Sequence, residues 1–351
     1  MKARILLTCA GGTMVPDLLT HLRADPVLKP YLVGVDASPD AAGRAYVDAF
    51  YQVPWGEDAT YVDEVARIVA AEKVSLVLPG SDPEAFSLAA GRDKIAAAGA
   101  VVLASPVAVL DLIRDKQATY RALQAAGLRV PEHVCVASVD DLRLAIADFG
   151  YPRRSVIVKP VAGRGGRGMR VLLGSDEAPA AWIGGGAREK RVPGLATAEE
   201  MNEWLLDGTL MVMPLLHAPV HDVDVFAIRG KARAALVRRR FNPAGIPFTG
   251  NRIVSDPAIM KYCLEIAEAL GLDALHDIDL MTDDQGRPCL LEVNPRPSGS
   301  VVAAHVAGFP IMASAIAETL GTPYPLLAPV RDIDVGMAPR AILMVQAADL
   351  S

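Results

Sequence analysis

Strand and helix signals alternate along the first 110 residues of the chain. Short apolar runs have the length of buried strands, and the segments between them have helical periodicity. The pattern predicts strands at residues 4–8, 32–36 and 75–79 and helices at residues 15–22 and 61–71. Because parallel strands need a crossover connection, which is usually a helix, this alternation predicts a parallel sheet covered by helices. We therefore expect an α/β domain over residues 1–110.

Two turns in this region are candidate ligand sites. The turn at residues 8–13 carries Gly11 and Gly12, but it lacks the third spaced glycine of a dinucleotide-binding fingerprint. A tight strand-to-helix turn explains it better, and a dehydrogenase interpretation would rest on this incomplete motif alone. The segment 80–84 follows a predicted strand at its carboxyl end, where open sheets bind ligands. It either lines a site or caps the next helix.

A second unit is predicted to begin near residue 110. A helix is expected at residues 111–126, and a second one runs from its N-cap Ser138 to Phe149. Strands are expected at residues 133–136 and 155–160. The stretch 174–194 is rich in glycine, alanine and proline and is predicted as a connection or insertion. We expect a large domain over residues 111–330, with one subdomain at about 130–215, and a carboxy-terminal tail at 331–351.

A short segment with two carboxylates, an amide and an arginine constrains the chemistry. Strands are predicted at residues 278–281 and 289–294, and a hairpin turn at 282–286. Asp279 and Glu292 would then lie side by side, and the side chains of Glu292 and Asn294 would leave the same face. Such oxygen ligands suit Mg²⁺, and Arg296 follows as a cation for phosphate or carboxylate. The alternative is a solvated hairpin with ordinary surface acids.

A glycine-rich loop between two predicted strands is a candidate phosphate site. Lys159 lies in the strand before the loop, a strand is expected at 169–173 after it, and the loop itself consists of Gly163, Arg164, Gly165, Gly166, Arg167 and Gly168. Backbone N–H groups of such a loop can approach phosphate oxygens because no Cβ intervenes. A flexible hairpin loop is the alternative, and the Walker pattern is absent from this segment. Lys116 by itself is predicted to be an ordinary surface lysine.

Composition and charge restrict the class of protein. With 351 residues and 52% hydrophobic content, the chain can build more than one core, and a net charge of −6 argues against a nucleic-acid-binding surface. Four cysteines without a Cys-x-x-Cys pair favour neither a zinc site nor a disulfide framework, which fits a reducing cytoplasm. The most apolar stretch, 95–113, is predicted as a helix end, a strand and a helix start, and the first residues do not resemble a signal peptide. We expect neither a membrane nor a nucleic-acid partner.

Two motifs of this chain resemble the ATP-grasp superfamily, in particular single-unit proteins similar to carbamoyl-phosphate synthetase and biotin carboxylase. The first is Lys159 with the glycine loop, and the second is the run Leu291, Glu292, Val293, Asn294, Pro295 and Arg296. The resemblance covers nearly the whole chain. It implies an α/β fold with an amino-terminal Rossmann-like (pre-ATP-grasp) domain followed by a two-subdomain ATP-grasp fold.

The resemblance also implies roles for particular residues. Lys116 and Lys159 would contact the phosphates of ATP under a closing loop that includes Gly163, Arg164, Gly165, Gly166 and Gly168. The connection from Met213 to Leu216 would hold adenine, through the Pro214 carbonyl and the Leu216 N–H. The magnesium ligands would be Asp279, Glu292 and Asn294, and Arg296 would meet the reacting carboxylate or phosphate. The ribose contact would be Asp222 or His221.

A group of mostly basic residues has two possible interpretations. It either lines a pocket for an anionic acceptor or forms a solvated strand face, and it consists of Arg238, Arg239, Arg240, Asn251 and Arg252. We include Arg240 with Arg296 among the candidate catalytic residues.

The implied activity is an ATP-dependent carboxylate–amine ligase. A carboxylate oxygen would attack the γ-phosphate, and an amine would displace phosphate from the resulting acyl phosphate to leave an amide. The partners would be a small-molecule carboxylate and an amine, with ATP and Mg²⁺ as cofactors, and a homodimer is left open. The alternatives are carboxyphosphate or carbamoyl phosphate chemistry and a non-catalytic nucleotide-binding regulator.

Overall fold

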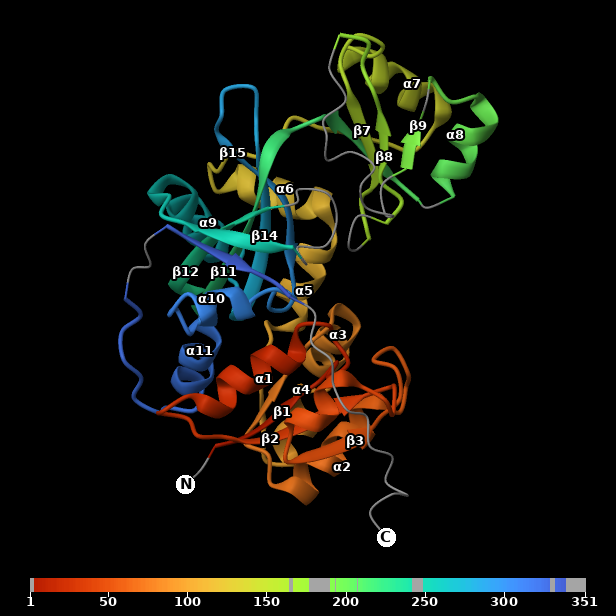
Figure 1. Cartoon of the computed structure of the whole chain (residues 1–351). Coiled ribbons are helices and arrows are strands. Elements are labelled where there is room, and N and C mark those ends of the chain that lie inside the picture. Colours follow the sequence, from red (N-terminus) through yellow and green to blue (C-terminus); the bar gives the residue numbers. More distant parts are fainter. Residues whose placement is uncertain are drawn as a thin grey trace.

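The computed structural model describes residues 3–163, 167–176, 190–192, 194–206, 208–241, 249–328 and 332–338. The strands in these residues form three sheets, of five, five and six strands. Figure 1 shows the sheet of the amino-terminal residues at one end of the molecule, a second sheet at the other end, and the six-stranded sheet between them.

The amino-terminal sheet is parallel throughout. Its strands are β1 (Arg4–Leu7), β2 (Tyr31–Asp36), β3 (Ala49–Gln52), β4 (Leu76–Leu78) and β5 (Val101–Val102), in the order β3-β2-β1-β4-β5. The helices are α1 (Val15–Ala24), α2 (Tyr61–Glu72), α3 (Asp82–Ala90) and α4 (Arg92–Ala97), with a 3-10 helix, η1 (Ala42–Tyr46). The predicted parallel sheet is confirmed. Because the strand order reverses at β1, the turns after β1 and β4 face a common crevice, where such sheets bind ligands.

The chain then passes through two helices where the sequence predicted one. The helices are α5 (Val107–Arg114) and α6 (Lys116–Ala125), so the expected single helix over 111–126 is wrong. The break lies at Asp115, whose side chain accepts from the N–H of Ala118 at 2.9 Å and whose backbone forms a β-bridge with Ala162. The prediction for residues 95–113 is confirmed, since α4, β5 and α5 divide this stretch, and no helix among the described residues is long and apolar enough to cross a membrane.

The second sheet carries the lysine of the glycine-loop motif. It contains β6 (Val134–Val136), β7 (Val156–Pro160), β8 (Arg170–Leu172), β9 (Lys190–Val192) and β10 (Leu210–Pro214), in the order β6-β10-β7-β8-β9. Two helices accompany it, α7 (Val139–Asp148) and α8 (Ala198–Leu205). Ser138 caps α7 by accepting from the N–H of Asp141, as predicted. The proposed domain limits, at about residues 110, 130, 215 and 330, stay predictions.

The six-stranded sheet holds most of the charged candidate residues. Its strands are β11 (His217–Ile228), β12 (Lys231–Arg240), β13 (Gly250–Val254), β14 (Ala274–Thr282), β15 (Pro288–Asn294) and β16 (Ile333–Gly336), in the order β15-β14-β11-β12-β13-β16. The helices of this region are α9 (Pro257–Ala269), α10 (Val302–Val306) and α11 (Ile311–Thr319).

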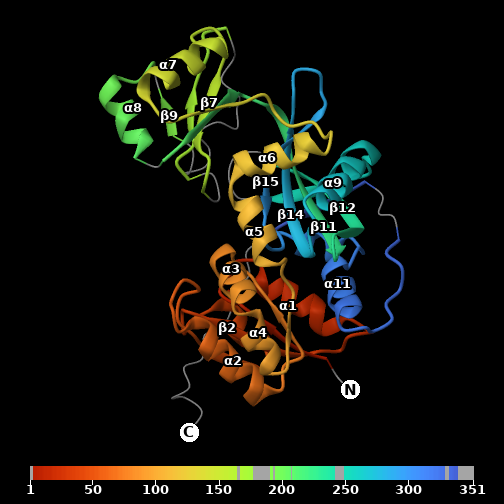
Figure 2. The same ribbon diagram turned by 180° about the vertical axis from the view of Figure 1, so that it is seen from behind.

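The two faces of this sheet bury different partners. One face packs Val223, Val225 and Val237 in a common core with residues of α5, α6 and α9, helices that can be followed in Figure 2. At one end of the opposite face, Phe226 and Leu236 pack with residues of α1, α10 and α11. Because side chains alternate between the faces of a strand, the rest of that second face is free to carry polar groups. Its charged residues form the candidate site.

Candidate active site

Charged side chains from neighbouring strands line up on one face of the six-stranded sheet. Across the β14–β15 hairpin, Asp279 lies opposite Glu292 and Asp277 lies opposite Asn294. On the other side of β14, Asp279 pairs with Asp222 of β11. The predicted hairpin is confirmed, with Asp279 and Glu292 side by side and Asn294 on the same face.

Two arginines of β12 neutralise the acids of β11. Arg238 donates from Nε to Asp224 Oδ2 at 2.7 Å and from Nη2 to Oδ1 at 3.0 Å, and both side chains are fully buried. Arg240 donates from Nε to the two oxygens of Asp222 at 2.8 and 3.0 Å, and its Nη2 lies 3.3 Å from Asp279 Oδ1. Buried carboxylates are tolerated when they are paired and hydrogen-bonded in this way. The arginines therefore allow one sheet face to concentrate negative charge.

The basic residues of β12 and β13 do not act as one set. Arg238 and Asn251 are fully buried beneath the acids, and Arg240 lines a cavity beside them. Arg239 is exposed, and Arg252 pairs with an exposed carboxylate at 3.2 Å. Neither sequence interpretation holds for all five residues, because alternation along the strands sends them to opposite faces.

We expect Asp224→Ala to lower the free energy of unfolding by about 3 kcal/mol, because Arg238 loses its two-point partner inside the protein. Asp334→Ala is the matched control, since it breaks the exposed pair with Arg252 on the same sheet and should cost less than about 1 kcal/mol. Urea unfolding followed by circular dichroism measures both. Equal losses in the two variants would contradict a stabilising role for the buried pair.

The two lysines predicted to meet phosphate lie at the same wall as the acids. Lys116 is only 8% exposed; its Nζ donates to the Gly163 carbonyl at 3.1 Å and lies 3.4 Å from Glu292 Oε2. The expectation of an ordinary surface lysine is therefore wrong. Lys116 begins α6, and the break at Asp115 turns this helix end toward the loop.

Lys159 is equally buried, but no counter-ion among the described residues lies at bonding distance. It is 8% exposed, and within the described residues no hydrogen bond or ion pair engages its Nζ. Burial, followed by the nearby charge of Lys116, lowers the pKa of Lys159 to about 7. A buried, unpaired ammonium group is costly, so this position suits an anionic ligand.

The glycine-rich loop is described only at its ends. Gly163 accepts from Lys116, Arg167 lines the cavity, and Gly168 has a φ of 76°, which favours glycine. Arg164, Gly165 and Gly166 lie outside the described residues. The phosphate-binding role of the loop stays a prediction.

Arg296 connects the hairpin to the amino-terminal domain. Its Nε donates to Asp82 Oδ1 at 2.9 Å, and its Nη1 donates to the Pro297 carbonyl at 2.9 Å. Asp82 is the first residue of α3, in the segment 80–84 that the sequence indicated as a lining or a cap. This segment does line the cavity, so the amino-terminal domain supplies one wall of the site.

A cavity of about 680 Å³ joins these groups. Its sheet side is lined by Lys116, Lys159, Arg240, Asp277, Asp279, Glu292, Asn294 and Arg296. Its other side includes the turn with Gly12, the segment 80–84 and Trp55, which is 77% exposed. The turn with Gly12 is the tight turn predicted, because its N–H donates to the Cys9 carbonyl at 3.0 Å.

The donor set at the hairpin suits a hard divalent cation. Asp279, Glu292 and Asn294 present oxygens on the cavity wall, and carboxylate oxygens of Asp222 and Asp277 lie within 4.8 Å of one of Asp279. Burial, followed by the charge of Asp222, raises the pKa of Asp277 to about 7. Burial and Asp277 raise the pKa of Asp279 well above its usual range. A bound cation would displace the proton of Asp279, because metal ligands bind in the deprotonated form, and its charge would favour the ionised form of Asp277 nearby. The residues present therefore fit Mg²⁺.

The predicted nucleoside contacts are not among the residues that line this cavity. Met213 is 2% exposed, Leu216 is 6% exposed, and with Pro214 they belong to or follow β10. The adenine contact stays a prediction. Asp222 is fully buried against Arg240, so its carboxylate has no surface to offer a ribose, and we do not retain that guess.

Sequence reasoning missed Asp277 and Asp224, and it named Asp82 only as part of the segment 80–84. A signal existed for the first two, because Asp277 precedes Asp279 by two positions and Asp222 precedes Asp224 by two, and such spacing places side chains on one face of a strand. The pairing of Asp82 with Arg296 gave no comparable signal, since the two residues lie 214 positions apart.

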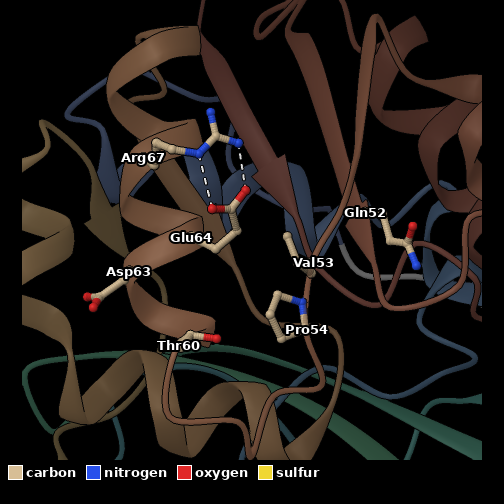
Figure 3. A pocket seen from close by; sticks show the side chains of 7 residues that line it. All are labelled: Gln52, Val53, Pro54, Thr60, Asp63, Glu64 and Arg67. Carbon is tan, nitrogen blue, oxygen red and sulfur yellow. Dashed lines mark hydrogen bonds and ion pairs between the residues drawn. The ribbon is translucent and has the colours of Figure 1, made fainter.

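A second hollow lies on the amino-terminal domain and is lined by Gln52, Val53, Pro54, Thr60, Asp63, Glu64 and Arg67 (Figure 3). The guanidinium group of Arg67 turns to Glu64, with hydrogen bonds of 3.0 and 2.6 Å. The predicted site residues that the structure describes line the other cavity or lie outside both, so we do not assign a role to this hollow.

Three family models match successive parts of the chain. The model described as "PylC-like, N-terminal domain" matches residues 7–103. "Carbamoyl-phosphate synthase L chain, ATP binding domain" matches residues 115–188, and "ATP-grasp in the biosynthetic pathway with Ter operon" matches residues 207–338. The predicted site residues lie within the second and third matches.

Curated relatives are identical to this chain at about a quarter of the aligned positions. A D-alanine–D-alanine ligase of Pseudomonas entomophila is 27% identical over 203 residues, which are 57% of this chain and 58% of that protein. A carbamoyl phosphate synthase large chain of Thermomicrobium roseum is 28% identical over 287 residues, which are 80% of this chain and 25% of that protein. The chain thus spans less than two thirds of the length of these relatives.

The fold recurs in a solved enzyme structure. N5-carboxyaminoimidazole synthetase from Staphylococcus aureus superimposes with a TM-score of 0.67 at 14% identity, covering 93% of this chain and 79% of that one. The predicted fold class, an amino-terminal Rossmann-like domain followed by a two-subdomain ATP-grasp fold, is confirmed. The resemblance to the ATP-grasp superfamily is therefore confirmed by the family models that match residues 115–188 and 207–338 and by the fold.

Proposed function

We propose that the protein is an ATP-dependent carboxylate–amine ligase that uses Mg²⁺. The observation that carries this proposal is the single cavity in which Lys116, Lys159, the oxygen ligands of the hairpin and Arg296 meet. The two lysines suit phosphate, the oxygens suit a hard cation, and Arg296 suits a carboxylate or a transferring phosphoryl group.

In the proposed reaction, Lys159 and Lys116 bind the phosphates of ATP beside Gly163, where the glycine loop begins. Asp279, Glu292 and Asn294 would hold Mg²⁺, which neutralises charge on phosphate oxygens when it is bound. Arg296 and Arg240 orient the substrate carboxylate, whose oxygen attacks the γ-phosphorus while the bond to the ADP oxygen breaks. Positioning and charge neutralisation supply most of the rate enhancement in such transfers.

The second half of the proposed reaction forms the amide. The amine nitrogen attacks the carbonyl carbon of the acyl phosphate, phosphate leaves with the C–O bonding electrons, and the nitrogen loses a proton. The amino-terminal domain forms one wall of the cavity that the two lysines also line, and its Asp82 contacts Arg296 there. We propose that the amine binds along this wall.

We expect the correct carboxylate to stimulate ADP release and to give a hydroxamate when hydroxylamine replaces the amine. Arg296→Lys should lower both signals by about 100-fold, because lysine keeps the charge but cannot form the planar two-point contact. A panel of carboxylate and amine pairs, read by a coupled ADP assay and by the ferric colour of the hydroxamate, makes the measurement. An active carboxylate that never forms a hydroxamate would contradict the acyl phosphate.

Carboxyphosphate or carbamoyl phosphate chemistry is the second candidate, favoured by the match of residues 115–188 to the carbamoyl-phosphate synthase model. The same panel decides between the two, because this candidate requires bicarbonate with ammonia to be the best pair. A non-catalytic regulator would bind ATP without ADP release in the presence of any pair.

We propose that the reaction takes place in the cytoplasm, which is consistent with four free cysteines. A homodimer stays a prediction, and sedimentation equilibrium tests it directly.

A further inference from the structure

Asp277 lies at the centre of the charged sheet face and has no role in the function proposed above. It pairs with Asn294 on one side and with Asp224 on the other, and its side chain is 4% exposed. Its Oδ2 accepts from Asn294 Nδ2 at 3.2 Å and lies 3.9 Å from Arg296 Nη1. A single buried carboxylate thus touches one proposed metal ligand and one proposed catalytic arginine.

The contact with Asp277 fixes which end of the Asn294 amide faces the cavity. The NH₂ group of Asn294 donates to Asp277 Oδ2, and the ionised form of Asp277 enforces this orientation because it can only accept. The opposite orientation would place the amide oxygen against a carboxylate oxygen and leave two buried acceptors unsatisfied. With the NH₂ group held, the amide oxygen of Asn294 is left for the cavity, where Asp279 and Glu292 present their own oxygens.

The same geometry argues against Asp277 as a ligand of the cation. Its Oδ2 is occupied by the Asn294 amide, while its Oδ1 is inaccessible and has no hydrogen bond within the described residues. The nearest cation to Oδ1 is Arg238 Nη2 at 3.7 Å, beneath the sheet face. Asp277 therefore contacts the proposed metal ligand Asn294 without binding the cation itself.

We propose that Asp277 is a positioning residue that turns the Asn294 amide oxygen to the metal and, together with Asp82, holds Arg296 beside it. This inference rests on the proposed function, because it presupposes a cation at Asp279, Glu292 and Asn294. Residues that orient metal ligands in this way typically change metal affinity by about 10- to 100-fold when they are removed.

The test measures cation affinity rather than turnover. Mn²⁺ stands in for Mg²⁺, and electron paramagnetic resonance reports free Mn²⁺ in the presence of saturating ADP. Asp277→Val, which keeps the size of the side chain but cannot accept, should raise the Mn²⁺ dissociation constant by about 10- to 100-fold. Asp277→Asn keeps an acceptor for the Asn294 amide and should recover part of that loss. If the valine variant does not fold, Asp277→Ser replaces it, since its hydroxyl is too short to reach the amide.

The decisive comparison is a double-mutant cycle with Asn294→Ala. If Asp277 acts through Asn294, then Asp277→Val should change the Mn²⁺ affinity of the Asn294→Ala protein by less than about threefold, because contacting residues are not additive. Full additivity would overturn the proposal and make Asp277 an independent contributor. An unchanged affinity in Asp277→Val alone would also overturn it.

Controls separate this inference from the proposed function. Asp334→Asn removes an exposed carboxylate from the same sheet and should leave Mn²⁺ affinity unchanged. If the wild-type protein with ADP does not bind Mn²⁺ at all, the proposed metal site fails together with the inference. Only the inference fails if the wild type binds Mn²⁺, the Glu292→Gln variant does not bind it, and the Asp277→Val variant binds it with wild-type affinity.

Discussion

Replacing Glu292 by glutamine is expected to reduce magnesium-dependent turnover by about a thousand-fold, which corresponds to about 4 kcal/mol of transition-state stabilisation. Glu292 is opposite Asp279 in the hairpin and lines the cavity beside both lysines. Glutamine keeps the size of the side chain but removes the charge that a hard cation prefers. The fold should survive, because the strand pairing depends on the backbone and the glutamine amide can still occupy the same space.

The measurement is the rate of ADP release as a function of Mg²⁺ concentration, with circular dichroism as the check on folding. Asp284→Asn is the matched control, since it removes a carboxylate from the turn of the same hairpin, where Asp284 contacts Arg154 and His217 at the surface. It should leave the magnesium dependence unchanged. A Glu292→Gln protein that turns over normally, with the wild-type magnesium dependence, would remove this residue from the metal site.

The sheets were predictable because their signals are local. The apolar runs of β1, β2 and β4 and the alternation in β14 and β15 are strand patterns that need no partner to be recognised. The helix break at Asp115 was not predicted, although aspartate is a good N-cap, because the helical pattern continues through it. What ends α5 there is a backbone bridge to Ala162, which is distant in sequence.

The site was predictable to the extent that its residues share a strand or a hairpin. Glu292, Asn294 and Asp279 could be placed together from their spacing alone. The burial of Lys116 could not, because its contacts are the Gly163 carbonyl, 47 positions away, and Glu292 on the six-stranded sheet. Asp222 was misjudged for the same reason, since its charge is neutralised by an arginine on the next strand.

Nucleotide binding is expected to take up a proton above about pH 7, through Lys159. In the free protein burial lowers the pKa of Lys159 to about 7, and a bound phosphate would raise it again by favouring the charged form. At pH 6 the amine is charged in both states, so little proton uptake should accompany binding. At pH 8.5 it is largely neutral when free, so uptake should approach one proton, and affinity should fall by at most about tenfold per pH unit.

Calorimetric titration with the non-hydrolysable β,γ-imido analogue of ATP, in two buffers of different ionisation enthalpy, measures this uptake. Lys159→Arg keeps the charge at every pH and is the matched control. This variant should bind the ATP analogue without the proton uptake that we assign to Lys159. Lys159→Met should weaken binding by about 100-fold at pH 6, where wild-type Lys159 is charged, because a charge-assisted phosphate contact contributes about 1.5–3 kcal/mol. The difference between this variant and the wild type should shrink as the pH rises, since the wild type must then bind a proton before the contact forms. If wild type and Lys159→Arg take up the same number of protons at pH 8.5, the uptake belongs to another group, and Lys159 does not change its charge on binding phosphate.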